Sequence, residues 1–179
     1  MSRKVSTIIC GFTAGLLLVS ACGCDRVYRM LDKEGAQEKK LIGDALPFEQ
    51  NDAIREVQEL LKIYGYNPGA ADGKLGLHTR NAVERFQKDN GLKPTRFIDT
   101  ETWERLHVPV KKGLISEQEM NMTRIQETLQ KSGFDPGTID GKFGPKTKKA
   151  VKGFQKSRGL KVDGKIGFQT LFALAQAAS

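Results

Sequence analysis

The residues best suited to bind a ligand form a short motif that occurs twice, 68 positions apart. Each copy has an aspartate, a glycine and a lysine in succession, and a second glycine follows two positions after the lysine. Both copies precede a stretch with helical periodicity, and the free backbone N–H groups and positive dipole end of a helix start attract anions. We therefore predict ligand-binding residues in both copies: Asp72, Gly73, Lys74 and Gly76 in the first, and Asp140, Gly141, Lys142, Phe143, Gly144 and Lys146 in the second.

The same motif also has a simpler interpretation. Tight turns prefer aspartate and glycine, because an aspartate side chain bonds to nearby backbone and glycine tolerates positive φ. On this interpretation the aspartates and glycines only build the turn. Lys74 and Lys142 are required by no turn, so these two residues are the members of the motif that favour a binding role.

Residues typical of catalysis are scarce. His78 and His107 are the only histidines, all three cysteines lie within the first 24 residues, and no Gly-x-Ser-x-Gly motif of serine hydrolases is present. We therefore expect a protein that is not an enzyme and that uses no metal and no cofactor. The enzymatic alternative rests on paired carboxylates, which would need a cleft that separates them by about 5 to 9 Å.

The positive charge is concentrated in the C-terminal part of the chain. The formal net charge is +8, and residues 116–179 have 11 lysines and arginines against 6 aspartates and glutamates. Such a surface either serves solubility alone or attracts an anionic polymer or lipid headgroups. Four lysines share the solvent side of the helix expected over 145–158, namely Lys146, Lys149, Lys152 and Lys156.

An internal repeat contains all of these residues. Residues 57–106 align with residues 125–174 without a gap, and 22 of the 50 aligned positions are identical. Glycines, a proline and helix-face residues are shared alike, which indicates two copies of one folded unit. The predicted organisation is a first module over 52–107, a semi-rigid linker over 108–115 with one proline and one glycine, and a second module over 116–179.

Both modules are predicted to begin with a helix. Apolar residues at i, i+3 and i+7 positions mark its buried side, from Ile54 in the first module and from Met122 in the second. The start of the helix in the second module is ambiguous by about two turns. Capping boxes begin both at Ser116 and at Thr123, and each would place a helix start directly after it.

Two further helices are expected in each module. The second helix should cover 77–90 and 145–158, and the third should follow Asp99 in one copy and Gly167 in the other. A unit of about 60 residues buries only about 60% of its unfolded surface, so we expect the two modules to dock on each other. The predicted fold class is therefore all-α, with two tandem three-helix modules.

Several aromatic and amide side chains are assigned to the interior. Trp103 aligns with a leucine on a buried helix side, and Tyr66 and Phe134 follow the first helix in the two copies, so all three are predicted core residues. Gln87 and Gln155 lie next to core phenylalanines, and we expect their amides to bond to a loop backbone.

The N-terminal residues have the pattern of an export signal. Two basic residues precede an apolar run over 5–21 that ends in small residues. The sequence Leu-Val-Ser-Ala-Cys that ends at Cys22 resembles the lipobox of bacterial lipoproteins, whose cysteine is acylated after cleavage. The resemblance implies a signal peptide over 1–21, lipidation of Cys22 and a tether over 22–51. An ordinary secretory signal or an uncleaved anchor is the alternative.

The two modules share a longer sequence pattern. It consists of Asp-Gly-x-x-Gly, Thr-x-x-Ala-Val-x-x-Phe-Gln, Gly-Leu and a closing leucine, in the same order and at the same spacing in both copies. This pattern resembles the peptidoglycan-binding domain found beside many cell-wall hydrolases, over about two thirds of the chain. The second copy matches more fully, because Asp163-Gly164 forms a second Asp-Gly turn where the first copy has Thr95-Arg96.

This resemblance implies a non-catalytic module that recognises peptidoglycan through its stem peptides, whose carboxylates suit a cationic surface. Together with the lipobox, it implies a lipoprotein of the cell envelope that holds membrane and wall together and faces the periplasm or the wall. The outer membrane is expected if the cell has one, and no nucleic-acid partner is expected. The alternative is an interaction protein that docks and regulates a separate cell-wall hydrolase or assembly factor.

Overall fold

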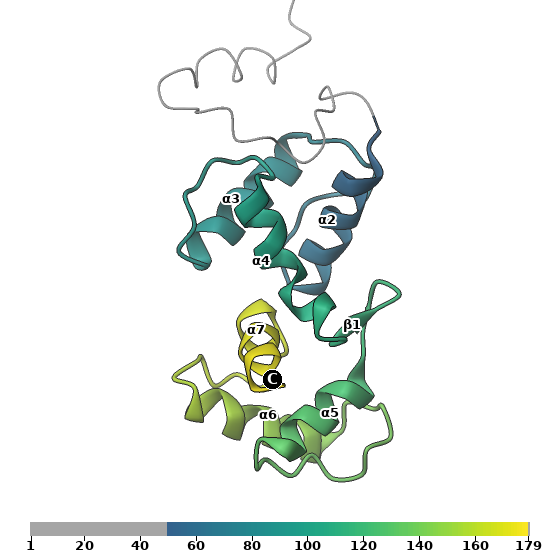
Figure 1. Ribbon diagram of the computed structural model, residues 1–179, viewed down its shortest axis with the longest axis vertical. Coiled ribbons are helices and arrows are strands. Elements are labelled where there is room, and N and C mark those ends of the chain that lie inside the picture. Colours follow the sequence, from purple (N-terminus) through teal and green to yellow (C-terminus); the bar gives the residue numbers. More distant parts are fainter. Residues whose placement is uncertain (1–49, 179) are drawn as a thin grey trace, which may run out of the picture.

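The computed structural model describes residues 50–178, which form six helices and one short hairpin (Figure 1). The predicted signal peptide, Cys22 and nearly all of the predicted tether lie outside the described residues. Module 1 contains α2 (Asp52–Ile63), α3 (Leu77–Asp89) and α4 (Thr100–Lys111). A hairpin of β1 (Ile115–Ser116) and β2 (Glu119–Met120) leads to module 2, which contains α5 (Met122–Lys131), α6 (Pro145–Ser157) and α7 (Phe168–Ala177). This confirms the predicted all-α architecture of two three-helix modules.

The helix starts follow from local chemistry. Asn51 caps α2, because its side-chain oxygen accepts from the N–H groups of Ala53 and Ile54 at 2.9 and 3.3 Å. Asp99 caps α4 as predicted, with the N–H of Thr102 at 2.8 Å from its carboxylate. Proline in the first turn starts α6, where its missing N–H removes no helical bond.

The start of α5 differs from both predicted capping boxes. Asn121 caps this helix, and its side-chain oxygen accepts from the N–H of Arg124 at 3.0 Å. Ser116 instead pairs with Glu119 across the antiparallel hairpin, so the chain is extended at this point and no helix starts there. Thr123 lies inside the first turn of α5. Neither prediction included the competing hairpin, which takes up the residues between the two modules.

The segment expected to be a linker, 108–115, is instead part of the folded modules. Helix α4 continues through Pro109 to Lys111 and then ends in a Schellman motif at Gly113, whose φ is 70°. The N–H of Leu114 donates to the carbonyl of Pro109 at 3.0 Å, and the side chain of Leu114 is fully buried. A proline in the last turns of a helix removes one N–H donor without ending the helix, so α4 ends only at the glycine that follows.

The two modules share one continuous hydrophobic core. Helix α7 of module 2 packs against α4 of module 1, and Figure 1 shows α7 lying between the two modules. The ring of Phe168 reaches into module 1, where its centroid lies 4.9 Å from that of Tyr64. At the rim, the side-chain amide of Gln169 donates to the carbonyl of Asp89 at 2.9 Å. The expected docking of the two modules is thus present.

The predicted interior residues occupy the expected places. Tyr66 and Phe134 are partly buried and pack edge-on against Phe86 and Phe154, the central rings of the two modules. Trp103 is also partly buried against the core. Among the described residues, no helix combines the length and the apolar character needed to cross a membrane.

Candidate functional site

A buried glutamine of the preceding helix holds the Asp-Gly-Lys loop of module 2. The Oε1 atom of Gln126 accepts from the N–H of Gly141 at 2.9 Å. Its Nε2 atom donates to the carboxylate of Asp140 at 3.2 Å, to the carbonyl of Lys142 at 3.0 Å and to the hydroxyl of Thr147 at 3.2 Å. One side chain therefore joins α5, the loop and the first turn of α6.

Module 1 repeats this arrangement with the corresponding residues. Gln58 accepts from the N–H of Gly73 at 2.8 Å and donates to Asp72 at 3.0 Å, to the carbonyl of Lys74 at 3.0 Å and to the hydroxyl of Thr79 at 2.9 Å. Our sequence analysis missed these two glutamines. The signal was available, because a glutamine, an aspartate and a threonine recur with the same spacing in both modules.

The same loop occurs once more in module 2, between its second and third helices. Gln155 accepts from the N–H of Gly164 at 2.9 Å and donates to Asp163, to the carbonyl of Lys165 and to the hydroxyl of Thr170 at 2.9 to 3.2 Å. This confirms that the amide of Gln155 bonds to a loop backbone.

The corresponding loop of module 1, between α3 and α4, differs in sequence from the other three loops but has the same pattern of hydrogen bonds. Gln87 accepts from the N–H of Arg96 at 3.0 Å and donates to the hydroxyl of Thr95 and the carbonyl of Phe97, both at 2.9 Å. Arg96 has a φ of 65° at the position where the other three loops have glycine. A threonine hydroxyl takes the place of the aspartate, so the departure preserves the architecture.

These bonds explain the aspartates and glycines of the predicted site as loop builders. The N–H of Lys142, and then the amide of Gln126, hold the pKa of the Asp140 carboxyl below its usual value. The N–H of Lys74 and the amide of Gln58 do the same for the pKa of Asp72. These contacts support the turn-building interpretation, whereas contact with a ligand stays a prediction.

The remaining predicted residues are placed so that a ligand can reach them. Lys74, Lys142 and Lys146 are exposed, and Phe143 has 44% of its surface exposed. Gly76 and Gly144 occupy the N-cap positions of α3 and α6, and neither helix start has a side-chain cap. First-turn N–H groups without a side-chain cap, next to a lysine, can bind an anion.

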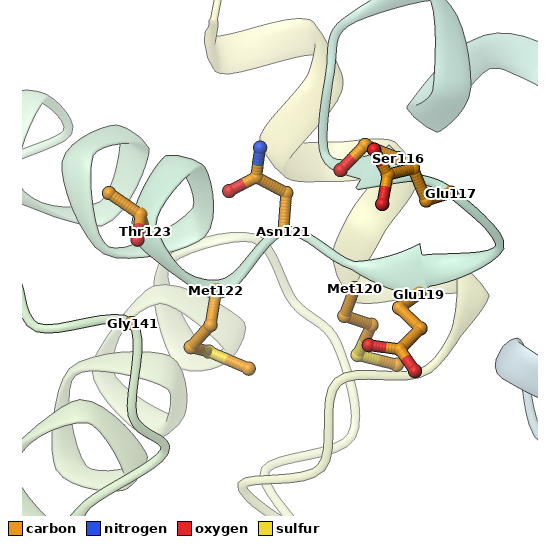
Figure 2. Close-up of a pocket in the computed structure, with 8 residues that line it drawn as sticks. All are labelled: Ser116, Glu117, Glu119, Met120, Asn121, Met122, Thr123 and Gly141. Carbon is orange, nitrogen blue, oxygen red and sulfur yellow. The ribbon is translucent and has the colours of Figure 1, made fainter.

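A pocket of about 440 Å³ lies beside the loop of module 2, at the start of α5 (Figure 2). Figure 2 shows the side chains of Met120 and Met122 on one side of the chain, with that of Asn121 pointing the opposite way. Of the predicted site residues only Gly141 lines this pocket. The complete lining is Ser116, Glu117, Glu119, Met120, Asn121, Met122, Thr123 and Gly141.

This pocket could not be predicted from sequence, because the hairpin that forms half of its lining has only two paired positions in each strand. Its connecting residues, Glu117 and Gln118, have φ values of 51° and 62°, a conformation that side chains other than glycine and asparagine adopt at a cost. Alternation over two residues is too short to predict a strand from sequence.

The two histidines differ in their surroundings. His107 is buried, with Nδ1 at 2.7 Å from the carbonyl of Trp103 and Nε2 at 3.0 Å from the carboxylate of Glu56. His78 is exposed at the start of α3. Within residues 50–178, no three His, Cys, Asp or Glu side chains come together as metal ligands would.

Comparison with known proteins matches both modules to one family. The model of a family described as "Putative peptidoglycan binding domain" matches residues 50–106 and again residues 118–174. No solved structure matches the chain.

Three relatives are similar to parts of the chain. The N-acetylmuramoyl-L-alanine amidase CwlL of Bacillus licheniformis is 31% identical over 133 residues, which cover 68% of this chain and 34% of the amidase. From Bacillus subtilis, the protein named YbfG is 37% identical over 99 residues, covering 54% of this chain and 14% of YbfG. The carboxy-terminal processing protease CtpB of the same species is 34% identical over 80 residues, which cover 45% of this chain and 16% of CtpB. The matches thus span between 14% and 34% of these relatives' lengths.

Proposed function

Because the chain belongs to the peptidoglycan-binding domain family, with two tandem copies, we propose that it is a non-catalytic binder that holds a membrane to the cell wall. Its modules bind the stem peptides of peptidoglycan. An acyl group on Cys22 attaches the other end to a membrane of the cell envelope, which is the outer membrane in a cell that has one. The family membership supports the wall ligand, and the lipobox resemblance supports the anchor.

One structural observation carries the binding role: the loop over 140–144 presents cationic and apolar groups at an open helix start. Lys142 and Phe143 are exposed there, Lys146 lies in the first turn of α6, and the N-cap Gly144 offers no side chain to the helix N–H groups. Stem peptides have carboxylates, which such N–H groups and lysines bind through charge-assisted hydrogen bonds. The glutamine bonds keep the loop rigid, so little entropy is lost on binding.

The relatives support a ligand in the cell wall. One of them is named an N-acetylmuramoyl-L-alanine amidase, and its name describes an enzyme that acts on a bond of the wall polymer. We propose that the present chain binds the same polymer without cutting it. The buried position of His107, with both ring nitrogens engaged, supports a structural role for that residue.

Co-sedimentation with purified sacculi tests the binding role. We expect the soluble fragment 25–179 to pellet with sacculi at modest ionic strength. The double variant Lys142→Ala/Lys146→Ala should bind less tightly, whereas Lys131→Ala, another exposed lysine of module 2, should bind as the parent does. Weaker co-sedimentation of Lys74→Ala with sacculi would show that module 1 also takes part in binding.

Two outcomes would contradict the proposal. A fragment that stays wholly in the supernatant would favour the alternative role of docking a separate hydrolase or assembly factor. Release of soluble muropeptides from the sacculi would show catalysis.

The membrane anchor needs a separate experiment in cells. We expect labelled palmitate to enter the protein, and the label should be absent from Cys22→Ser. Labelling that persists in this variant would contradict acylation at Cys22. Because this experiment contains no wall-binding step, the anchor and the wall ligand are tested independently.

A further inference from the structure

The solvent side of α6 is a positively charged surface without negative groups. Helix α6 has five lysines and no acidic residue, and all five are exposed. Among the described residues, none of the five makes an ion pair with a carboxylate. In Figure 1, α6 lies at the end of the molecule away from α2, α3 and α4. We call this surface the α6 lysine face; its members are Lys146, Lys148, Lys149, Lys152 and Lys156.

Module 1 provides an internal comparison, because α3 has the same place in its module as α6. On α3 the charges are mixed and paired. Glu84 forms ion pairs with Lys88 at 2.5 Å and with Arg96 at 3.4 Å. In the repeat alignment Lys152 occupies the position of Glu84. The shared fold therefore works with a negative charge at this position, and module 2 has a positive charge there instead.

The lysine face is not explained by helix stability. Like charges at i, i+3 and i, i+4 repel one another and weaken an isolated helix, and here Lys148, Lys152 and Lys156 succeed one another at i+4. A glutamate at position 152 would relieve this repulsion, as Glu84 does in module 1. Solubility does not require so many unpaired like charges on one helix side, so a partner with negative charge is the better explanation.

The loop after α6 holds two of these lysine stems. A Cβ atom on Gly164 would lie 3.0 Å from Cγ of Lys148 and 3.0 Å from Cε of Lys152, so a side chain here would press on both stems, and the glycine leaves room for them against the loop. Stems held in this way lose less freedom when their ammonium groups bind a partner. The lysine face is thus partly ordered before binding.

Exposed apolar side chains stand next to this charged surface. Val162 is 49% exposed in the loop that contacts the lysine stems, two positions before Gly164. Phe143 is 44% exposed, two positions before the start of α6. Lysines combined with exposed apolar side chains suit the surface of an anionic bilayer, where ammonium groups meet phosphates and apolar groups enter the acyl boundary.

We propose that the α6 lysine face binds the phosphate headgroups of an anionic lipid bilayer, with Val162 and Phe143 at the interface. The membrane surface shares Lys146 and Phe143 with the proposed peptidoglycan site, whereas Lys148, Lys149, Lys152, Lys156 and Val162 belong to the membrane surface alone. Membrane binding through this surface does not require acylation of Cys22. It would hold module 2 against the membrane, as a basic surface that reinforces a lipid anchor does. A dissolved polyanion would use the lysines but would gain nothing from the exposed apolar groups.

Vesicle co-sedimentation tests this proposal with a fragment that lacks the anchor. Within the part of the chain that the structure describes, the buried hydrophobic core runs from Ile54 to Ala175, and fragment 25–179 contains all of it. We expect it to bind vesicles of phosphatidylcholine mixed with phosphatidylglycerol and not vesicles of phosphatidylcholine alone. Binding should disappear at about 1 M salt, where the screening length is about 3 Å.

The double variant Lys149→Glu/Lys152→Glu should bind the anionic vesicles about tenfold less tightly or weaker still. Its matched control is Lys62→Glu/Lys93→Glu, which makes the same change of charge at exposed lysines of module 1 and should bind as the parent does. Circular dichroism and urea unfolding check that both variants are folded. Binding to sacculi should persist in Lys149→Glu/Lys152→Glu, which separates this surface from the peptidoglycan site.

Three results would overturn the proposal. The first is no binding of the parent fragment to anionic vesicles at low salt. The second is equal loss of binding in the two double variants, because binding would then follow net charge alone. The third result has two parts: soluble polyphosphate displaces the protein from vesicles, and it binds Val162→Ser as tightly as the parent. The surface would then recognise phosphate polymers and not a bilayer.

Discussion

The ring of Phe168 lies edge-on against the ring of Phe86, with 4.7 Å between the centroids and an angle of 77° between the planes. Phe168 begins α7 of module 2, whereas Phe86 is the fully buried centre of module 1. Tyr64, the C-cap residue of α2, contacts both rings. The two modules therefore share one core, and we expect them to unfold as one cooperative unit.

Removal of this contact should uncouple the modules. We expect Phe168→Ala to lower the free energy of unfolding by about 3 to 5 kcal/mol, because it leaves a cavity in a buried aromatic cluster. The single tryptophan, Trp103 in α4, reports on module 1 by fluorescence, whereas circular dichroism reports on both modules. The two urea transitions should coincide in the parent and separate in the variant. Phe143→Ala, a change at an exposed position, should leave the two urea transitions where they are in the parent.

Gln126, the glutamine of α5 that holds the Asp-Gly-Lys loop, should be a major contributor to the stability of module 2. In Gln126→Ala the N–H of Gly141, the carbonyl of Lys142 and the hydroxyl of Thr147 lose their bonds to this side chain. We expect a loss of about 2 to 4 kcal/mol in the free energy of unfolding, measured with urea. Gln130→Ala, an exposed glutamine on the same helix, is the control. A loss as small as that of the control would contradict the assigned role.

The hairpin between the modules should tolerate a stabilising change. Glu117 and Gln118 both have positive φ values, which asparagine and glycine adopt at lower cost. The variant Glu117→Asn/Gln118→Gly should therefore be more stable by about 1 kcal/mol in thermal or urea unfolding. A variant no more stable than the parent would mean that this backbone conformation is unstrained.

Acid should destabilise the modules through the loop aspartates. Backbone N–H bonds hold the pKa values of Asp72, Asp140 and Asp163 below the usual 3.8, with the lysine two residues later as the main donor in each loop. A lowered pKa in the folded state gives stability above the unfolded pKa, and this stability is lost as the pH falls through the folded value. We expect the free energy of unfolding to decrease as the pH falls below about 4.

The triple variant Asp72→Asn/Asp140→Asn/Asp163→Asn tests the source of this decrease. Its amide oxygens can still accept the loop N–H groups, but it has no charge to titrate at these positions. Its unfolding free energy should change less between pH 4 and pH 2 than that of the parent. An equal slope in both proteins would assign the acid sensitivity to other carboxyl groups.

Much of the local structure could be predicted from sequence. The helix starting after Asp99 and the proline that begins α6 follow from residue types within a few positions of each other, and the loop carbonyls bonded by Gln87 and Gln155 lie ten positions away in the chain. The repeat indicated two similar modules, because the same hydrogen-bonding and apolar residues recur at a constant spacing. The partners of a cap or a turn are close in the chain, so sequence spacing is enough to identify them.

The tertiary structure decided what each buried surface packs against. Periodicity marks Phe168 as part of a helix but does not show that its ring enters the other module. The hairpin and its pocket depend on chain geometry between the modules. Only the fold could show that no carboxylate within residues 50–178 pairs with a lysine of α6. Sequence could not predict these contacts, because an amphipathic pattern indicates only which side of a helix or strand is buried. The element that covers this side comes from a distant part of the chain.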